Sequence, residues 1–172
     1  MSNLRATPSA SCDTLTLLQG AETFVHYACE CLREGRRDVT ILSTSLPKAL
    51  YGNDEFCAAL SALARSHRQA DIRILVLDPE PLVSGHHPLR RLQQRLPSKM
   101  NIRQAAMQGE HPQRGYMIVD RSCLLLQHDD GQFDGFCNSE ARAEAASLLE
   151  EFNELWSRQS CEIAELRTFT HL

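Results

Sequence analysis

The sequence has little aromatic character, almost no lysine and no long apolar run. Aromatic residues make up 6% of its 172 residues, and Lys48 and Lys99 are its only lysines. No apolar stretch approaches the roughly 18 residues that a membrane-spanning helix needs, and the N-terminus has no apolar core for export. We therefore predict a cytoplasmic protein that does not enter a membrane.

Motifs for cofactor and metal chemistry are also missing. The glycines are dispersed, so no phosphate-binding loop is formed, and no Ser occupies a Gly-x-Ser-x-Gly elbow. The seven cysteines are odd in number and scattered through predicted helices and strands, which predicts reduced, mostly buried thiols. Cys29 and Cys31 are two residues apart on a predicted helix, so they lie on different faces and do not converge on zinc. We expect neither a cofactor nor a metal.

The composition is typical of one globular domain, with 42% hydrophobic and 23% charged residues. Residues 1–15 are rich in Ser, Thr, Asn and Pro without periodicity, and they are predicted to be a flexible tail. Residues 16–172 are long enough for one domain with a real core and too short for two. We therefore expect a single α/β domain after the tail.

The charge is unevenly distributed along the chain. A net charge of −4 argues against general coating of nucleic acid, because phosphate neutralisation dominates such binding. The segment from His86 to Arg103 nevertheless has no acid, whereas the C-terminal helix is acidic. The basic residues are Arg90, Arg91, Arg95, Lys99 and Arg103. This pattern fits either solvated helices on each side of a sheet or a strip that binds anions or docks a partner.

Two short apolar runs rich in β-branched residues, 39–42 and 72–77, predict strands that are buried on both faces. An amphipathic helix between them makes a strand, helix, strand unit, which closes as a parallel pair with a right-handed crossover. Functional groups of such sheets collect beyond the carboxyl ends of the strands. Ser43 and Thr44 are expected there.

The remaining elements complete a mixed α/β sandwich. We predict a central sheet of six or seven strands, parallel at its first strands and antiparallel around a hairpin, with helices on both faces. Before the hairpin we predict a helix at Ala21–Glu34, a helix that begins at Asn53 or Asp54, a short helix at 87–96 and a strand at 100–104. The hairpin covers 117–126 and turns at Asp120, and an edge strand at 133–137 follows it. The closing helix is predicted to be capped by Asn138 or Ser139 and to carry Phe152 and Trp156 on its apolar stripe.

The hairpin 115–126, GYMIVDRSCLLL, resembles the signature hairpin of the phospholipase D-like fold. The order of the surrounding segments supports the resemblance, including Gly135-Phe136-Cys137-Asn138, which is similar to the family's Gly-Ser-x-Asn element. That family places a nucleophilic His seven residues, and a Lys five residues, before the Asp. Here these places hold Gln113 and Gly115. The resemblance therefore implies a degenerate half-domain without the family's catalytic residues.

Three functional hypotheses follow. The first is a non-catalytic regulatory or interaction module, because attack on a phosphodiester needs a nucleophile and a cation. The second is a phosphodiesterase or phosphotransferase with a rewired site that uses His87 or His111, and the third is binding of nucleic acid or another anion through the basic segment. The candidate ligand-binding residues are Ser43, Thr44, His87, Arg90, Arg114, Asp120 and Asn138.

Structural roles compete with these functional ones. An Asp that opens a tight turn usually accepts hydrogen bonds from nearby backbone amides, so Asp120 is expected to do so. His87 precedes Pro88, which is an ordinary way to begin a helix. Arg114 is one residue away from the family's Lys position, so on a strand it turns to the opposite face.

The expected partner is another protein or a second copy of the chain. The resemblance implies a two-fold dimer, because single-copy relatives pair two half-sites between chains. Similar domains occur beside bacterial N-acyltransferase-like domains, although this chain has no acyl-coenzyme A loop. An acyltransferase partner is thus an implication of the resemblance, and we do not expect a nucleic-acid or membrane partner.

Overall fold

A mixed eight-stranded sheet forms the centre of the computed structural model, which describes residues 14–106, 114–129 and 132–166. The strands are β1 (Leu15–Gln19), β2 (Asp38–Ser43), β3 (Asp71–Val76), β4 (Met100–Ala105), β5 (Gly115–Val119), β6 (Cys123–Gln127), β7 (Asp134–Asn138) and β8 (Ser160–Glu162). Their order is β1-β7-β6-β5-β2-β3-β4-β8. β2, β3 and β4 are parallel, and every other pairing is antiparallel. The predicted mixed sheet is confirmed, with more strands than expected.

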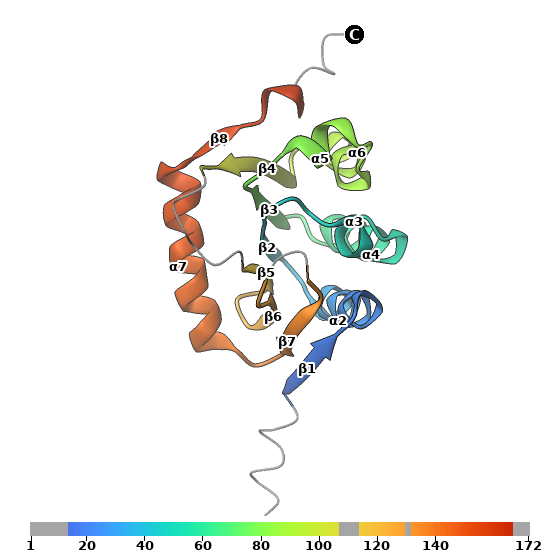
Figure 1. The fold of residues 1–172 in the computed structure, drawn as a ribbon, viewed down its shortest axis with the longest axis vertical. Helices are drawn as coiled ribbons and strands as arrows, with labels where there is room; N and C mark the ends of the chain where they lie inside the picture. Colours follow the sequence, from blue (N-terminus) through green and yellow to red (C-terminus); the bar gives the residue numbers. More distant parts are fainter. Residues whose placement is uncertain (1–13, 107–113, 130–131, 167–172) are drawn as a thin grey trace, which may run out of the picture.

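The described helices cover both faces of this sheet (Figure 1). One face carries α2 (Ala21–Glu34), α3 (Lys48–Tyr51), α4 (Asp54–Ser66), α5 (Glu80–Ser84) and α6 (Pro88–Arg95). The long C-terminal helix α7 (Arg142–Arg158) crosses the other face alone. None of these helices combines the length and the apolar character that crossing a bilayer demands.

Apolar side chains divide between two core clusters, one on each face of the sheet. The larger cluster joins α2–α6 to the sheet, with Phe24, Ile41 and Ile74 fully buried. The smaller cluster lies beneath α7 and is centred on Tyr116 and Phe152. Strands that face a core on both sides have near-continuous apolar sequences, which is why β2 and β3 are predictable.

The helix ends test the predicted caps. Asn53 caps α4, because its side-chain oxygen accepts hydrogen bonds from the amides of Glu55 at 2.8 Å and Phe56 at 3.3 Å. The prediction that Asn138 or Ser139 caps α7 is wrong, since α7 begins after Ala141 without a side-chain cap. Asn138 instead accepts a hydrogen bond from the amide of Glu140, 3.0 Å away, in the turn before the helix.

The sheet edges differ from the sequence prediction. The strand expected at the edge, β7, is an interior strand between β1 and β6. The true edges are β1 and β8, which are short and mostly exposed, so the sequence pattern did not indicate either one. Residue 15, predicted to end the tail, belongs to β1, and residues 1–13 lie outside the described residues.

Candidate functional site

The carboxyl end of β2 and the beginning of β5 meet at one end of the sheet. β5 runs antiparallel to β2, and Leu42 is the partner of Tyr116. One residue beyond this pair lie Ser43 and Gly115, and Gly115 in turn pairs with Gln127 of β6. We call the group Ser43, Thr44, Gly115 and Gln127 the strand-end site. It contains two of the predicted ligand-binding residues and the predicted position of the family's cation.

The turn after β2 uses the polar groups of the strand-end site for its own stability. Ser43 is fully buried, and its hydroxyl oxygen accepts a hydrogen bond from the amide of Leu46 at 3.0 Å. Leu46 has a φ of 56°, a left-handed conformation that is uncommon for a bulky residue. The carbonyl of Thr44 accepts hydrogen bonds from the amides of Leu77 at 3.1 Å and Asp78 at 2.7 Å. These bonds hold a strained turn against the end of β3.

Gln127 is a buried polar residue that sequence reasoning missed. It is 2% exposed and pairs in register with Gly115 on one side and Gly135 on the other. Its Nε2 atom donates to the carbonyl of Gln132 at 3.0 Å, whereas its buried Oε1 atom has no hydrogen-bond partner among the described residues. A polar residue directly after the apolar run 124–126 was the signal available in the sequence.

Gly135 is required by a close approach of two strands. A Cβ atom at this position would lie 1.8 Å from the carbonyl oxygen of Leu126, which is backbone and cannot move independently. The resemblance to the family's Gly-Ser-x-Asn element therefore coincides with a local packing requirement of this sheet.

Arg114 points away from the strand-end site. Its guanidinium lies 3.6 Å from the carboxylate of Glu151 on α7, and both side chains are about half exposed, so the ion pair is weak. Met117, which shares the face of Gly115, belongs to the core cluster on the opposite face of the sheet. The predicted opposite orientation of Arg114 is thus confirmed.

Asp120 lies at the other end of β2. Its carboxylate accepts hydrogen bonds from three consecutive amides, those of Arg36 at 2.7 Å, Arg37 at 2.9 Å and Asp38 at 3.0 Å. Asp120 therefore has a structural role, as expected, but the amides that it binds precede β2 and do not belong to its own turn, so the expectation of a local turn bond is wrong. The length of β2, roughly 15 Å, separates this carboxylate from Ser43.

Asn138 also lies at the Asp120 end. It pairs with Leu124, which follows the hairpin turn, and its side chain is bound in the turn before α7. Asp120 and Asn138 therefore do not join Ser43 and Thr44. The sequence alone could not reveal this separation, because it depends on which end of each strand a residue occupies.

His87 and Arg90 connect α6 to its surroundings. The ring of His87 is 1% exposed, its Nδ1 atom accepts from the amide of Leu89 at 3.2 Å, and its Nε2 atom lies 2.9 Å from the carbonyl of Leu46. Burial lowers the pKa of His87. Because Nδ1 accepts from an amide, Nε2 carries the ring proton and donates to Leu46. Arg90 donates to the carbonyls of Val83 and Glu165. Both residues thus make structural contacts with backbone groups of neighbouring segments.

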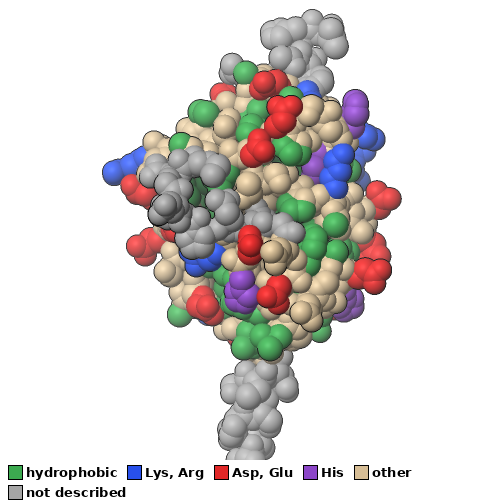
Figure 2. Space-filling model, in the orientation of Figure 1, with side chains coloured by type: hydrophobic (Ala, Val, Ile, Leu, Met, Phe, Trp, Pro, Cys, Tyr) green, Lys and Arg blue, Asp and Glu red, His purple; other side chains and the backbone are tan. Residues whose placement is uncertain are grey.

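The predicted basic strip is divided between two faces. Lys99 donates to the carbonyl of Ala64 at 3.1 Å on the side of α4, whereas the guanidinium of Arg103 lies over the Trp156 ring beside α7. Figure 2 shows Lys, Arg and His side chains gathered over α5 and α6. A groove of about 370 Å³ between α4 and α6 is lined by three arginines, Arg65, Arg91 and Arg95.

The cysteine prediction needs a correction. Cys31 and Cys123 form a disulfide, although the scattered positions of the cysteines predicted reduced thiols. They are 92 residues apart in the sequence, so only the packing of α2 on the hairpin brings them together. Cys137 lies beside them, with its Sγ atom 3.6 Å from that of Cys31. This convergence is another feature that spacing along the chain did not indicate.

Comparison with solved structures defines the class of the fold, which is phospholipase D-like. NucT from Helicobacter pylori is similar with a TM-score of 0.63 and 9% identity, and the match covers 87% of this chain and 97% of NucT. Nuc from Salmonella typhimurium, a phospholipase D family member, has a TM-score of 0.59 and 12% identity over 87% of this chain and 98% of Nuc. At these identities the comparison establishes the fold alone.

A family model identifies the chain more closely: it belongs to the domain of unknown function DUF7931, which matches residues 20–169. No curated protein sequence matches the chain. The archaeal chromatin protein TrmBL2 also shares the fold, with a TM-score of 0.61 and 13% identity. That match covers 85% of this chain, which spans about half, 53%, of TrmBL2.

Proposed function

We propose that this chain is a non-catalytic interaction module built on the phospholipase D-like fold. The observation that carries the proposal is Gly115, which lies buried at the start of β5, where the family resemblance places the cationic Lys. Glycine supplies neither charge nor a hydrogen-bond donor beyond its backbone. Gln113 holds the nucleophile's place in the sequence, and an amide is not a nucleophile for phosphodiesters.

Several of the polar groups that could build a rewired site are already engaged in structural contacts. The Ser43 hydroxyl binds the amide of Leu46, both ring nitrogens of His87 have backbone partners, and Arg114 faces Glu151. Catalysis of phosphoryl transfer depends on groups that are positioned toward the reacting phosphorus. These contacts therefore favour a scaffold role over a rewired phosphodiesterase.

The partner that we propose is a second copy of the chain, bound at the β1 edge. This edge strand, LTLLQ, contains no charge and no proline, the devices that normally protect an exposed edge from pairing. Leu15 is 48% exposed and Leu17 is 80% exposed. Leu17 is the central residue of β1, so two antiparallel copies would place Leu17 against Leu17 on a two-fold axis, a self-complementary arrangement.

An N-acyltransferase-like protein is the other partner that the sequence resemblance implies. The same edge can accept a strand from such a protein by main-chain hydrogen bonding. Co-purification from native cells distinguishes it from a second copy, because a mixed complex contains a second polypeptide of different mass.

Sedimentation equilibrium over micromolar concentrations tests the β1 dimer. We expect twice the 19.4 kDa of one chain for the wild type and a monomer for Leu17→Lys, which places two like charges at the two-fold axis. Gln69→Lys, an exposed residue in the α4–β3 loop, adds the same charge elsewhere and should leave the dimer intact. A wild-type mass of one chain throughout would reject the second copy as partner.

An assay with bis-p-nitrophenyl phosphate tests the absence of phosphodiesterase chemistry. We expect no hydrolysis above background. Hydrolysis that His87→Ala or His111→Ala abolished would instead establish a rewired active site, while activity unchanged by both substitutions would indicate a contaminant.

The arginine groove supports a second candidate function, binding of a phosphate-rich ligand. Arg65, Arg91 and Arg95 are among the residues that line one groove, and guanidinium groups bind phosphate with favourable geometry. TrmBL2, one of the structural neighbours, binds DNA. Fluorescence anisotropy with DNA or RNA at several salt concentrations tests this: binding through the groove should weaken with salt and should be lost in Arg91→Glu.

A further inference from the structure

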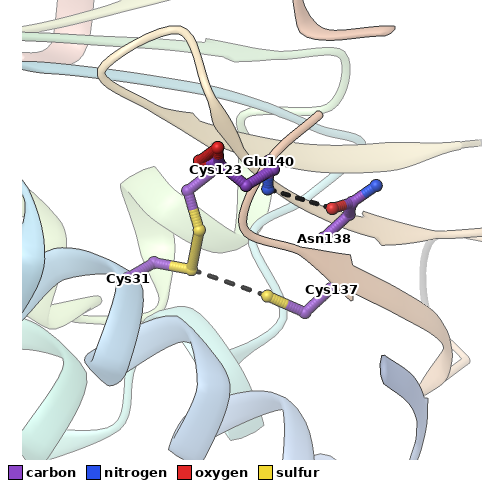
Figure 3. The surroundings of a disulfide bond; sticks show 5 residues. All are labelled: Cys31, Cys123, Cys137, Asn138 and Glu140. Atoms are coloured by element: carbon purple, nitrogen blue, oxygen red, sulfur yellow. Dashed lines mark hydrogen bonds between the residues drawn. A yellow bond between two sulfur atoms is a disulfide. The ribbon is translucent and has the colours of Figure 1, made fainter. Parts of the chain in front are cut away.

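Three cysteines from three different elements converge on one point of the core (Figure 3). Cys31 comes from α2, Cys123 begins β6, and Cys137 lies in β7. All three Sγ atoms lie within 4.8 Å of one another. Cys31 is bonded to Cys123, and its sulfur is also 3.6 Å from that of Cys137. One disulfide and one thiol are thus in contact.

The three sulfurs differ in their access to solvent. Cys31 and Cys137 are each 6% exposed, whereas Cys123 is only partly buried. Burial, with the nearby charge of Glu34 as the second cause, raises the pKa of Cys137 to about 11. Cys137 is therefore held as a neutral, shielded thiol while Cys123 occupies the disulfide. Among the described residues, no His, Asp, Glu or further Cys joins the three sulfurs as a potential metal ligand.

A thiol that touches a disulfide sulfur has the partner that thiol–disulfide exchange requires. We propose that these residues form a three-cysteine exchange site in which Cys31 is the shared sulfur. The Cys137 thiol loses its proton and attacks Cys31 Sγ, which forms the Cys31–Cys137 bond. The Cys31–Cys123 bond breaks, and Cys123 leaves as a thiolate that takes up a proton. No electrons are gained or lost, so the exchange needs neither an oxidant nor a reductant.

The exchange has two structural consequences. It transfers the attachment of α2 from the β5–β6 hairpin to β7, the strand that pairs with β1. It also replaces the shielded thiol of Cys137 by the more accessible thiol of Cys123. Cys123 is then the position at which a small disulfide, such as oxidised glutathione, can modify the protein. This site is independent of the proposed interaction function.

Peptide mapping by mass spectrometry tests the proposal on the full chain. Thiols are blocked with N-ethylmaleimide at low pH before digestion, so that the disulfide pairs present in solution are preserved. For the wild type we expect both Cys31–Cys123 and Cys31–Cys137 peptides, with one disulfide per chain. Finding only Cys31–Cys123 would overturn exchange and leave an inert disulfide.

Single substitutions test the shared role of Cys31. After reduction, Cys123→Ser is treated with diamide, a two-electron thiol oxidant that becomes a hydrazine as two thiols become a disulfide. We expect the Cys31–Cys137 bond to form in this variant, and the Cys31–Cys123 bond to form in Cys137→Ser. Failure of Cys31 and Cys137 to form a disulfide in Cys123→Ser would overturn the proposal, as would a Cys123–Cys137 bond forming in Cys31→Ser as fully as the wild-type disulfide.

Two controls keep the result interpretable. Cys57→Ser removes a partly buried thiol outside the trio and should leave the wild-type map unchanged. Native mass spectrometry of protein purified under reducing conditions tests whether the three cysteines bind a metal ion instead. A stoichiometric metal ion that is lost on substitution of any of the three cysteines would overturn the exchange site in favour of a metal thiolate site. If a serine variant does not fold, the wild-type map alone decides the matter.

Discussion

The Nε2 atom of His87 lies 2.9 Å from the carbonyl oxygen of Leu46, which joins the start of α6 to the turn after β2. The amide of the same Leu46 donates to Ser43. One residue in a left-handed conformation therefore connects a buried imidazole to a buried hydroxyl. A neutral ring is needed only for the bond that Nδ1 accepts from the Leu89 amide at the start of α6, because Nε2 can donate to Leu46 in either protonation state.

The first prediction concerns the pH dependence of folding. Burial is the main cause that lowers the pKa of His87 below its ordinary value, and the charge of Lys48 also lowers it, while the bond to Leu46 opposes the shift. Below about pH 6.5 the unfolded chain takes up this proton before the folded chain does. The contribution is thus fully present above that pH and decreases as the pH falls, by at most roughly 1.4 kcal/mol per pH unit.

Urea unfolding between about pH 5.5 and 7.5 measures this slope. His87→Gln should be less stable at neutral pH and should show a shallower dependence on pH. His86→Gln, which changes the exposed neighbour, should retain the wild-type slope. Equal slopes for His87→Gln and the wild type would assign the pH dependence to other groups.

The second prediction concerns the core beneath α7. Phe152 is fully buried and stacks on Trp156 with ring centroids 5.7 Å apart, whereas Trp156 is partly exposed. Phe152→Ala should therefore lower the free energy of unfolding by roughly 3–5 kcal/mol. A smaller loss for Phe152→Ala than for Trp156→Ala in chemical denaturation would contradict the assignment.

Trp156 is held by different contacts from those of Phe152. Its ring lies beneath two guanidinium groups, those of Arg73 and Arg103, each 5.6 Å from the centroid. Partial burial and these cation–π contacts make Trp156→Ala destabilising by roughly 2 kcal/mol. Trp156→Phe, which retains a ring, should recover about half of that loss in the same denaturation experiment.

The third prediction concerns Gly135. A methyl group at this position would overlap the carbonyl oxygen of Leu126, so Gly135→Ala must separate β6 from β7. We expect a loss of at least roughly 3 kcal/mol in unfolding free energy, at the upper end for overpacking. Ser139→Ala, an exposed change just beyond the same strand, should be within about 0.5 kcal/mol of the wild type. A stable Gly135→Ala protein would mean that the two strands part easily.

The sequence predicts those helices and strands in which buried residues recur at regular intervals along the chain. α2 was predicted with its observed bounds, Ala21–Glu34, because its apolar residues recur with helical spacing and Gly35 follows. β1 was missed because only Leu18 of its five residues is buried. β8 has three residues and no buried one. Such edge strands are defined by pairing with distant segments, and no local pattern encodes that pairing.

The positions of some candidate site residues could also be predicted from local sequence patterns, and others could not. The placement of Ser43 beyond β2 follows from the parallel unit, whereas turn chemistry did not predict the distant amides that bind Asp120. Which strand ends coincide depends on sheet order, so the separation of Asp120 from Ser43 could not be derived from spacing. The convergence of Cys31 with Cys123 and Cys137 likewise arises only when α2 packs on the hairpin.

The three consecutive amides that hold Asp120 form a receptor for a carboxylate, which the protein fills with its own side chain. In Asp120→Ala this receptor would be vacant, and an external anion of similar shape could occupy it. Acetate should then raise the melting temperature of Asp120→Ala while leaving that of Asp129→Ala unchanged. The attachment of the hairpin to the segment before β2 would then depend on the concentration of a dissolved anion. In the native chain the Asp120 carboxylate is tethered beside the three amides, so its effective local concentration is fixed and saturating.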